Sequence, residues 1–226
     1  FEPLLAKYVL NPSDKLIDID TLYKEELDFE IAEQVSKNKS KAVQLANIFE
    51  LEEILLKELK KNNLLDLYKE IEIPLIPSLA QMELNGIKVD KEYLDELSAM
   101  WEEKINSIVK KAHGLAGEEF NLNSPKQVGE ILFEKLGLPV IKKTKTGYST
   151  SIKVLEKLED KHEIIPLIME FRKWSKLKST YVDALPPLIN SETGRIHTSF
   201  NQMITATGRL SSTEPNLQNI PIRTKE

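Results

Sequence analysis

Cysteine is absent from the 226 residues of this chain, and histidine occurs only three times. The absence of cysteine excludes a disulfide scaffold, a thiolate nucleophile and any cysteine-ligated metal, and it fits a reducing compartment. No apolar run approaches the roughly 20 residues of a membrane helix, and no basic leader precedes an apolar stretch, so we expect neither a membrane span nor a secretory signal. With 41% hydrophobic and 30% charged residues, the composition is that of an ordinary globular protein.

Charge is divided unevenly along the chain, although the formal net charge is only −5. Residues 1–119 carry 15 Lys and Arg against 25 Asp and Glu, whereas residues 120–226 carry 16 against 11. The balance disfavours a uniformly basic nucleic-acid coat, but the C-terminal half can still present one basic face to phosphate. Uneven scatter of surface charge explains the same numbers, so other features must decide.

Helical spacing of apolar residues dominates the first half of the chain. It runs from about residue 36 to 85, where an Asn-Gly pair is expected to end it in a left-handed conformation. Asp90 can cap the next helix, which is predicted over 91–112 and stopped by Gly114. The expected fold class is therefore mainly α.

Further helices are predicted in the second half. Ser124 at the cap, Pro125 in the first turn and Gln127 two residues further indicate a helix over 125–136. Two more helices are expected, one starting near residue 150 and one over about 164–182.

Non-helical segments separate and follow these helices. Residues 139–150 are predicted to form an exposed basic loop. Even-numbered apolar and β-branched positions predict strand structure over 195–207, broken at Gly208, and residues 210–223 show no period. The fold class is thus mainly α with a small antiparallel β element at the C-terminus.

The helix predicted over 164–182 has two chemically different sides. On a helical wheel its apolar side contains Leu167, Phe171, Trp174, Leu177 and Tyr181, and the opposite side contains Arg172, Lys176, Ser179 and Thr180. Two cations and two hydroxyls along one face have the donor type and spacing to follow a phosphate backbone. The alternative is an ordinary solvated face of an amphipathic helix.

Uncharged amides crowd around a cation near the C-terminus. Asn216, Gln218 and Asn219 follow Arg209 in a segment without helical or strand period. In the minor groove, purine N3 and pyrimidine O2 are acceptors at nearly equivalent places in every base pair, so such donors can sense pair geometry without reading sequence. The alternative is that the amides satisfy the backbone of a local turn.

Several strings together resemble bacterial DNA polymerase I, a member of the family A DNA polymerases. They are IEIPLIPSLAQMELNGIKVD at 71–90, FNLNSPKQVGEILFEKLGLP at 120–139, KLKSTY at 176–181, ETGRIHTSFNQ at 192–202 and TATGRLSSTEPNLQNIPIR at 205–223. The resemblance is nearly continuous from residue 71 to the C-terminus. It implies an α+β fragment of a family A polymerase, with the thumb over 71–190, its tip at about 115–160, and the start of the palm over 191–226.

The resemblance implies DNA-binding roles for particular residues. Arg209 and Gln218 match minor-groove contacts near the primer terminus, and Asn216 and Asn219 match neighbouring amides that hold template and primer. Arg172 and Lys176 match cations of the thumb helix that face duplex DNA, with Ser179 and Thr180 on the same side. Weaker candidates for phosphate contact at the thumb tip are Asn123, Lys142, Lys143, Thr144 and Ser149.

The resemblance also implies what this chain lacks. The metal carboxylates of family A polymerases, in a D-Y-S-Q-I-E strand and an H-D-E segment, would follow after residue 226, and the nucleotide-binding fingers helix is missing. We therefore predict no catalytic and no metal residue here; Mg²⁺ and dNTP belong to the complete enzyme, and this part grips primer–template duplex. The resemblance further implies a monomer without membrane contact, located in the bacterial cytoplasm with the nucleoid.

Residues 1–70 resemble the end of the family's 3′ to 5′ exonuclease domain. The Tyr-x-x-x-Asp metal motif of an active domain would fall near Lys39 to Val43, where neither residue is present. This predicts an inactive remnant, and the chain as a whole is expected to be an excerpt of a larger protein.

Two other interpretations stay open from the sequence. The first is a non-catalytic helical DNA-binding or scaffold module that shares ancestry with the polymerases. The second is one half of a split polymerase.

Overall fold

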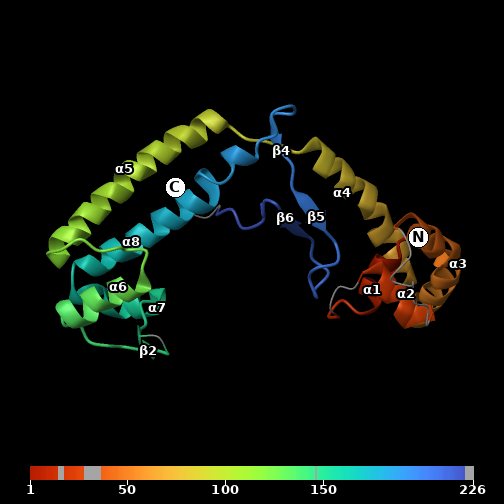
Figure 1. The fold of residues 1–226 in the computed structure, drawn as a ribbon, viewed down its shortest axis with the longest axis horizontal. Helices are drawn as coiled ribbons and strands as arrows, with labels where there is room; N and C mark the ends of the chain where they lie inside the picture. The colour runs from red at the N-terminus through yellow and green to blue at the C-terminus, as the bar shows by residue number, and fades with distance from the viewer. Residues whose placement is uncertain (15–17, 28–36, 146, 222–226) are drawn as a thin grey trace. The chain divides into compact units, whose positions relative to one another are not determined.

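The computed structural model describes residues 1–14, 18–27, 37–145 and 147–221, with the backbone alone for 37–46. These residues form mainly helices, and the strands are two or three residues long, so the predicted fold class is confirmed (Figure 1). The chain divides into two compact units. We call Phe1–Ile87 with Arg195–Glu226 the terminal unit and Lys88–Gly194 the central unit.

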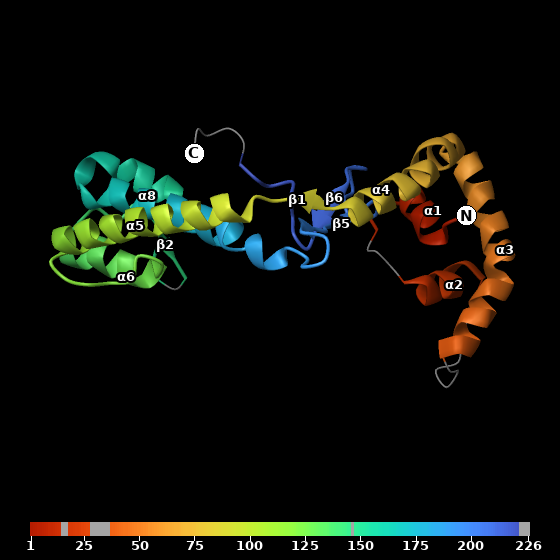
Figure 2. The same ribbon diagram turned by 90° about the horizontal axis from the view of Figure 1, so that it is seen from above.

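The helices of the terminal unit enclose an apolar core. They are α1 (Pro3–Leu10), α2 (Ile19–Leu27), α3 (Lys37–Lys61), the π-helical segment η1 (Leu67–Glu72) and α4 (Ile73–Asn85). Both α1 and α2 pack on α3 (Figure 2). The buried core comprises Leu5, Ala6, Val9, Leu22, Tyr23, Leu51, Leu55, Leu59 and Tyr68.

The helical run predicted over 36–85 is present but interrupted. Asn63, with φ 57°, lies in the turn between α3 and η1. The run ends at Gly86 as predicted, although this glycine combines φ 59° with an extended ψ of −176° and is not left-handed helical. A Cβ at Gly86 would lie 2.8 Å from the ring of His197 and 2.8 Å from the Ile196 carbonyl oxygen, so the close approach of the segment at Ile196 and His197 also requires glycine.

The strands near the C-terminus differ from the prediction. They are β4 (Arg195–Ile196), β5 (Ser199–Asn201) and β6 (Ser211–Thr213), and β5 pairs with β6 in antiparallel register with Phe200 opposite Ser212. The strand predicted over 195–207 therefore ends at Asn201, because the next side chains bind the helices of the terminal unit instead of a neighbouring strand. The segment predicted to have no period contains β6, which is too short to give a periodic signal.

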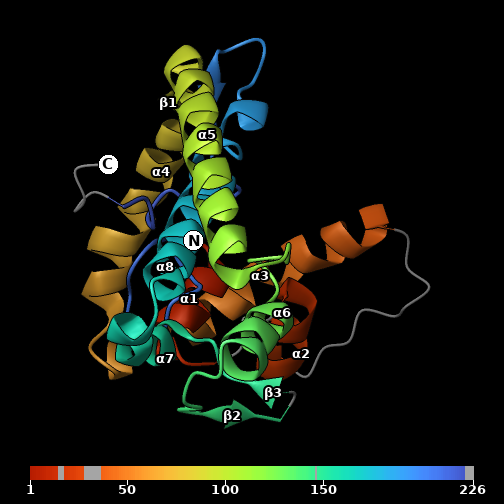
Figure 3. The same cartoon turned by 90° about the vertical axis from the view of Figure 1, so that its left-hand side faces the viewer.

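The central unit is built on two long helices that lie side by side. Its elements begin at β1 (Ile87–Lys88), on the unit boundary, and continue with α5 (Lys91–Ala116), α6 (Pro125–Gly129), η2 (Glu130–Lys135), β2 (Lys143–Thr144), β3 (Gly147–Tyr148), α7 (Ile152–Leu155), η3 (Glu156–Lys161), α8 (Ile164–Leu177), η4 (Lys178–Val182) and η5 (Pro186–Leu188). Helix α5 packs along α8, and α6, α7 and the β2–β3 hairpin gather at one end of the pair (Figure 3).

The ends of these helices test the predicted caps. Asp90 accepts a hydrogen bond from the Tyr93 amide at 3.0 Å and begins α5 as predicted. The predicted stop at Gly114 is wrong: α5 continues to Ala116 and ends at Gly117, whose φ of 72° is left-handed. Because Ala112 and Ala116 are buried in the core, packing holds the last turn against the cost of a glycine inside a helix, about 1 kcal/mol.

The capping pattern at residue 124 is confirmed in part. The Ser124 hydroxyl accepts from the Gln127 amide at 3.4 Å, and helical structure follows from Pro125 to Lys135. The Gln127 side chain accepts from the Asn121 amide at 2.6 Å instead of returning to Ser124. The basic loop predicted over 139–150 carries the β2–β3 pair, with Lys143 opposite Tyr148.

Candidate nucleic-acid interface

Helix α8 is seated on α5 by its aromatic side chains. Phe171 and Trp174 are each only 5% exposed, and the ring of Trp174 meets that of Trp101 edge to face at 5.0 Å between centroids. Such a pair adds about 0.5–1.5 kcal/mol to the burial of its area. The predicted apolar side of α8 therefore faces the core, whereas on the opposite side Lys176 is exposed and Arg172 is half-buried.

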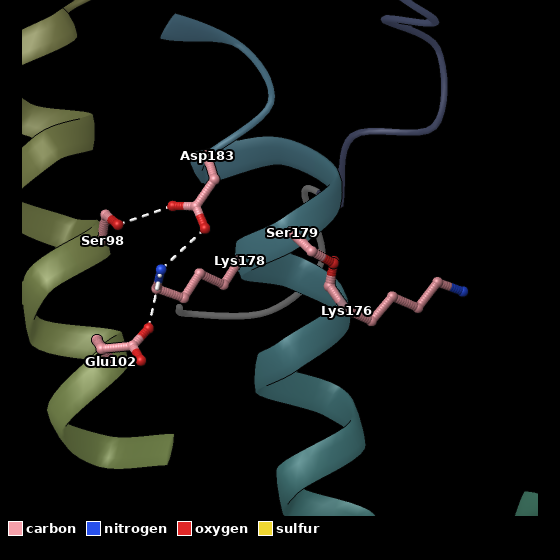
Figure 4. Close-up of polar contacts among 6 residues, drawn as sticks. All are labelled: Ser98, Glu102, Lys176, Lys178, Ser179 and Asp183. Atoms are coloured by element: carbon pink, nitrogen blue, oxygen red, sulfur yellow. Dashed lines mark hydrogen bonds and ion pairs between the residues drawn. The ribbon is translucent and has the colours of Figure 1, made fainter. Parts of the chain in front are cut away.

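Lys176 and Lys178, at the C-terminal end of α8, differ in their ion pairs and exposure. The Lys178 ammonium forms ion pairs with Glu102 of α5 at 3.0 Å and with Asp183 at 2.8 Å (Figure 4). Lys176 extends away from this network (Figure 4) and is exposed. Among the residues that the structure describes, the Lys176 ammonium has neither an ion pair nor a hydrogen bond.

The Lys178 network shifts the pKa values of its members. Its hydrogen bond with Asp183 raises the pKa of Lys178 above the ordinary value. For Asp183, burial opposes ionisation, but hydrogen bonds from Lys178 and Ser98 outweigh it and lower the pKa. The charge of Lys178 is thus balanced within the protein, whereas that of Lys176 is available to a partner.

The predicted hydroxyls of this face are present at the surface. Ser179 and Thr180 are both exposed on η4, the π-helical continuation of α8. The Ser179 hydroxyl donates to the Lys176 carbonyl at 3.4 Å, the length of a weak bond that a stronger acceptor can replace.

Arg172 is held by the protein and is half-buried. Its Nη2 donates to the Thr150 hydroxyl at 3.1 Å, and its Nη1 donates to the Thr150 carbonyl. Burial lowers the pKa of the guanidinium, but an arginine retains its charge at neutral pH. Among the residues that the structure describes, two of its five donors are used, so Arg172 is a fixed cation with further donors for a partner.

A groove of about 880 Å³ brings Arg172 together with most of the predicted tip residues. It is lined by Asn123, Ser124, Pro125, Lys126, Glu130, Glu134, Thr144, Gly147, Tyr148, Ser149, Thr150, Ser151 and Arg172. Asn123 and Thr144 are exposed, whereas Ser149 is only 8% exposed and lies 3.4 Å from the Ser151 hydroxyl. The carboxylates of Glu130 and Glu134 make one part of the lining unfavourable for an anion.

Lys142 and Lys143 are exposed outside the groove lining. The Lys143 ammonium lies 5.7 Å from the centre of the Tyr148 ring. The residue that the sequence prediction missed is Thr150, which anchors Arg172. Its signal is the run of hydroxyls over 149–151 directly after the basic segment.

In the terminal unit, the predicted amides also hold their own loop. The Gln218 side chain donates to the Leu210 carbonyl at 2.8 Å and accepts from the Ser212 amide at 3.1 Å. The Asn216 side chain accepts from the Gln218 amide at 3.0 Å. The local-turn interpretation therefore holds for these two residues, although each retains capacity for another bond because they are exposed.

Arg209 and Asn219 are exposed in the same segment. Within the described ranges, the Arg209 guanidinium makes no hydrogen bond or ion pair. The backbone carbonyl of Arg209 accepts a hydrogen bond from the Thr205 hydroxyl at 2.6 Å. The terminal unit thus presents one uncommitted cation beside amides that brace the backbone.

Metal ligands do not converge in the described part of the chain. No group of three or more His, Asp and Glu side chains is placed there to hold a metal ion. The sequence predicts that the exonuclease metal motif is missing from Lys39 to Val43. The side chains of these residues lie outside the described ones. No helix in the described ranges is long and apolar enough to cross a membrane.

Comparison with known proteins identifies the family. Residues 91–226 match the family model for DNA polymerase family A. The chain is 45% identical over 244 residues to DNA polymerase I of Bacillus subtilis (strain 168) and 43% identical over 241 residues to that of Geobacillus stearothermophilus. All of this chain is covered in both matches, but only 27% and 28% of the relatives.

A solved structure supports the same assignment. The POL domain of Pol1 from M. smegmatis, in complex with DNA primer-template and dNTP, superposes with a TM-score of 0.86 and 38% identity. The match covers 99% of this chain and 39% of that one. The chain belongs to DNA polymerase family A, and it spans little more than a quarter of the length of the two relatives named above.

Proposed function

We propose that this chain is part of a DNA-directed DNA polymerase that performs template-dependent nucleotidyl transfer in replication and repair, and that this part grips primer–template duplex. The proposal is supported by family membership and by the solved neighbour, whose title names DNA primer-template and dNTP as bound. The observation that carries it is the contrast between Lys176, exposed without a partner among the described residues, and Lys178, which is balanced by two carboxylates.

Lys176 would neutralise a phosphate of the duplex. An exposed ammonium without an internal partner gives up little when it binds phosphate, and counterions released from DNA add to the affinity. Ser179 and Thr180 on the same side would donate to phosphate oxygens. These contacts do not depend on base sequence.

The groove at the thumb tip would hold a second part of the backbone. Arg172 supplies a fixed charge, and Asn123, Thr144 and Ser149 surround it with neutral polar groups. The Thr144 hydroxyl donates to the Gly147 carbonyl at 3.1 Å and the Ser149 hydroxyl to Ser151 at 3.4 Å, so each would exchange this bond for one to phosphate. Because Glu130 and Glu134 repel an anion, we place the phosphate on the side of Arg172 and Thr150. Lys142 and Lys143 would add attraction from outside the groove lining.

The C-terminal loop would meet the minor groove. Arg209 can donate to the acceptors that all base pairs present there, and Asn216, Gln218 and Asn219 can contribute their remaining donors. Gln218 is already fixed by two backbone hydrogen bonds, which would present its remaining amide proton in one direction.

The complete enzyme would need converging carboxylates, which the described residues do not provide. Two-metal phosphoryl transfer requires converging carboxylates, so we assign Mg²⁺ and dNTP to other segments and derive no chemical step here. The division into an inactive exonuclease-like part over 1–70, a thumb over 71–190 and a palm segment from 191, and the monomeric state, are part of this proposal.

Duplex binding by this chain tests the proposal. Fluorescence anisotropy with a labelled primer–template should give equal affinities for duplexes of different sequence, each weakening steeply as salt increases. Binding that depends on base sequence, or the absence of salt-dependent binding, would contradict it.

A further inference from the structure

The loop that carries Arg209 is attached to the N-terminal helices of the same unit. The Tyr8 hydroxyl of α1 donates to the Thr205 carbonyl at 2.7 Å, across 197 residues of sequence. Thr205 in turn donates through its hydroxyl to the Arg209 carbonyl at 2.6 Å, and its carbonyl also accepts from the Gly208 amide at 3.4 Å. Thr205 therefore connects α1 directly to the backbone of Arg209.

Two further contacts fix the beginning of this loop. The Gln202 side chain donates to the carbonyl and the carboxylate of Glu72, at 3.1 and 2.9 Å. Met203 packs against the apolar core formed by α1, α2 and α3. Three of the four residues from Gln202 to Thr205 are thus bound to helices of the terminal unit, whereas Ile204 between them is 55% exposed.

We infer that Tyr8 is a positioning residue, which fixes the loop 202–209 and thereby the direction in which Arg209 leaves the unit. The inference rests on the proposed minor-groove role of Arg209 for its functional consequence. The inference assigns the N-terminal helices a structural role that requires no nuclease activity. They anchor the loop 202–209, which carries the proposed DNA contact of Arg209.

The chain offers a matched control within the same core. Tyr68 is also a tyrosine with a bonded hydroxyl, which accepts from the Glu2 amide at 2.8 Å and donates to the Glu2 carbonyl at 3.0 Å. Its hydroxyl bonds reach α1 but not the loop. Tyr8→Phe and Tyr68→Phe therefore remove the same group from the same unit, and only the first loosens residues 202–209.

Hydrogen exchange of the Gly208 amide, measured by NMR in the whole chain without DNA, tests the positioning itself. We expect Tyr8→Phe to accelerate exchange about threefold to tenfold, the size of effect of one net hydrogen bond. Tyr68→Phe should leave this amide unchanged. Equal exchange in wild type and Tyr8→Phe, or equal acceleration by both variants, would overturn the inference.

A double-mutant cycle on primer–template binding tests the functional consequence. Tyr8→Phe should weaken binding about threefold in the wild-type background and leave it unchanged in the Arg209→Ala background, since the positioned group is then absent. The same loss in both backgrounds would overturn the inference. An Arg209→Ala variant that binds like wild type would instead reject the proposed Arg209 contact, and the exchange of Gly208 then decides the role of Tyr8.

Discussion

The central and terminal units differ in how they hold the side chains that we propose to contact DNA. In the central unit, Lys176 lies on a helix that is fixed by its opposite, aromatic face, and its ammonium forms no ion pair or hydrogen bond with the described residues. In the terminal unit, Gln218 both braces the loop and faces solvent. The difference teaches that binding and stability can be separated by mutation at Lys176 but are coupled at Gln218.

Removal of the aromatic anchor should have the largest effect. Trp174→Ala deletes a ring packed on Trp101 and should lower the free energy of unfolding of the central unit by about 3–5 kcal/mol. Lys176→Ala, on the exposed face, should stay within about 0.5 kcal/mol of wild type. Urea unfolding followed by tryptophan fluorescence of the remaining ring and by circular dichroism measures both; similar losses would break the proposed separation.

Arg172 should show an intermediate effect, because its guanidinium also holds the backbone and hydroxyl of Thr150. Arg172→Ala leaves the Thr150 carbonyl and hydroxyl without their donors and should cost about 1–3 kcal/mol of stability. It should also lower the salt slope of duplex binding by about one unit.

Arg172→Lys serves as the matched variant. It keeps the charge but cannot reproduce both bonds to Thr150, so it should retain the salt slope and lose stability. A reduced slope together with full stability would contradict the assignment.

Gln218 should give a smaller, local effect in the terminal unit. Gln218→Ala removes bonds to Leu210 and Ser212, and we expect faster exchange of the Ser212 amide together with a loss of about 1 kcal/mol. Gln218→Glu keeps the acceptor for Ser212 and should protect that amide nearly as well as wild type. If the Ser212 amide exchanged in Gln218→Ala as slowly as in wild type, the Gln218 side chain would not stabilise this loop.

Removal of the Lys178–Asp183 ion pair by Asp183→Asn should have the smallest effect. It should lower the free energy of unfolding by less than about 1 kcal/mol, because the carboxylate is partly exposed. The lowered pKa of Asp183 stabilises the fold above its ordinary value of 3.8, and this contribution is lost as the pH falls below that value. The raised pKa of Lys178 stabilises the fold below its ordinary value of 10.5, and this contribution is lost as the pH rises through the raised pKa. Melting curves of wild type and Asp183→Asn across pH should converge at acid pH; a constant difference would contradict this.

The sequence predicts the central unit better than the loop of the terminal unit for a physical reason. Helical periodicity places Lys176 opposite Trp174, and the structure has this arrangement because one helix needs only one packed face. The hydrogen bond between Tyr8 and Thr205 joins residues 197 positions apart, and no local sequence pattern predicts such a contact. The strand predicted over 195–207 fails for the same reason, since contacts of Gln202 and Met203 with distant helices prevail over alternation.

The salt dependence of primer–template binding tests the central claim most directly, with Lys176→Gln compared against Lys178→Gln. Both variants remove one positive charge from neighbouring positions of the same helical rod. We predict that the slope of log affinity against log salt falls by about 0.9 in Lys176→Gln and stays at the wild-type value in Lys178→Gln. Equal slopes in the two variants would contradict the claim that the outward face of α8 and η4 carries the DNA contact.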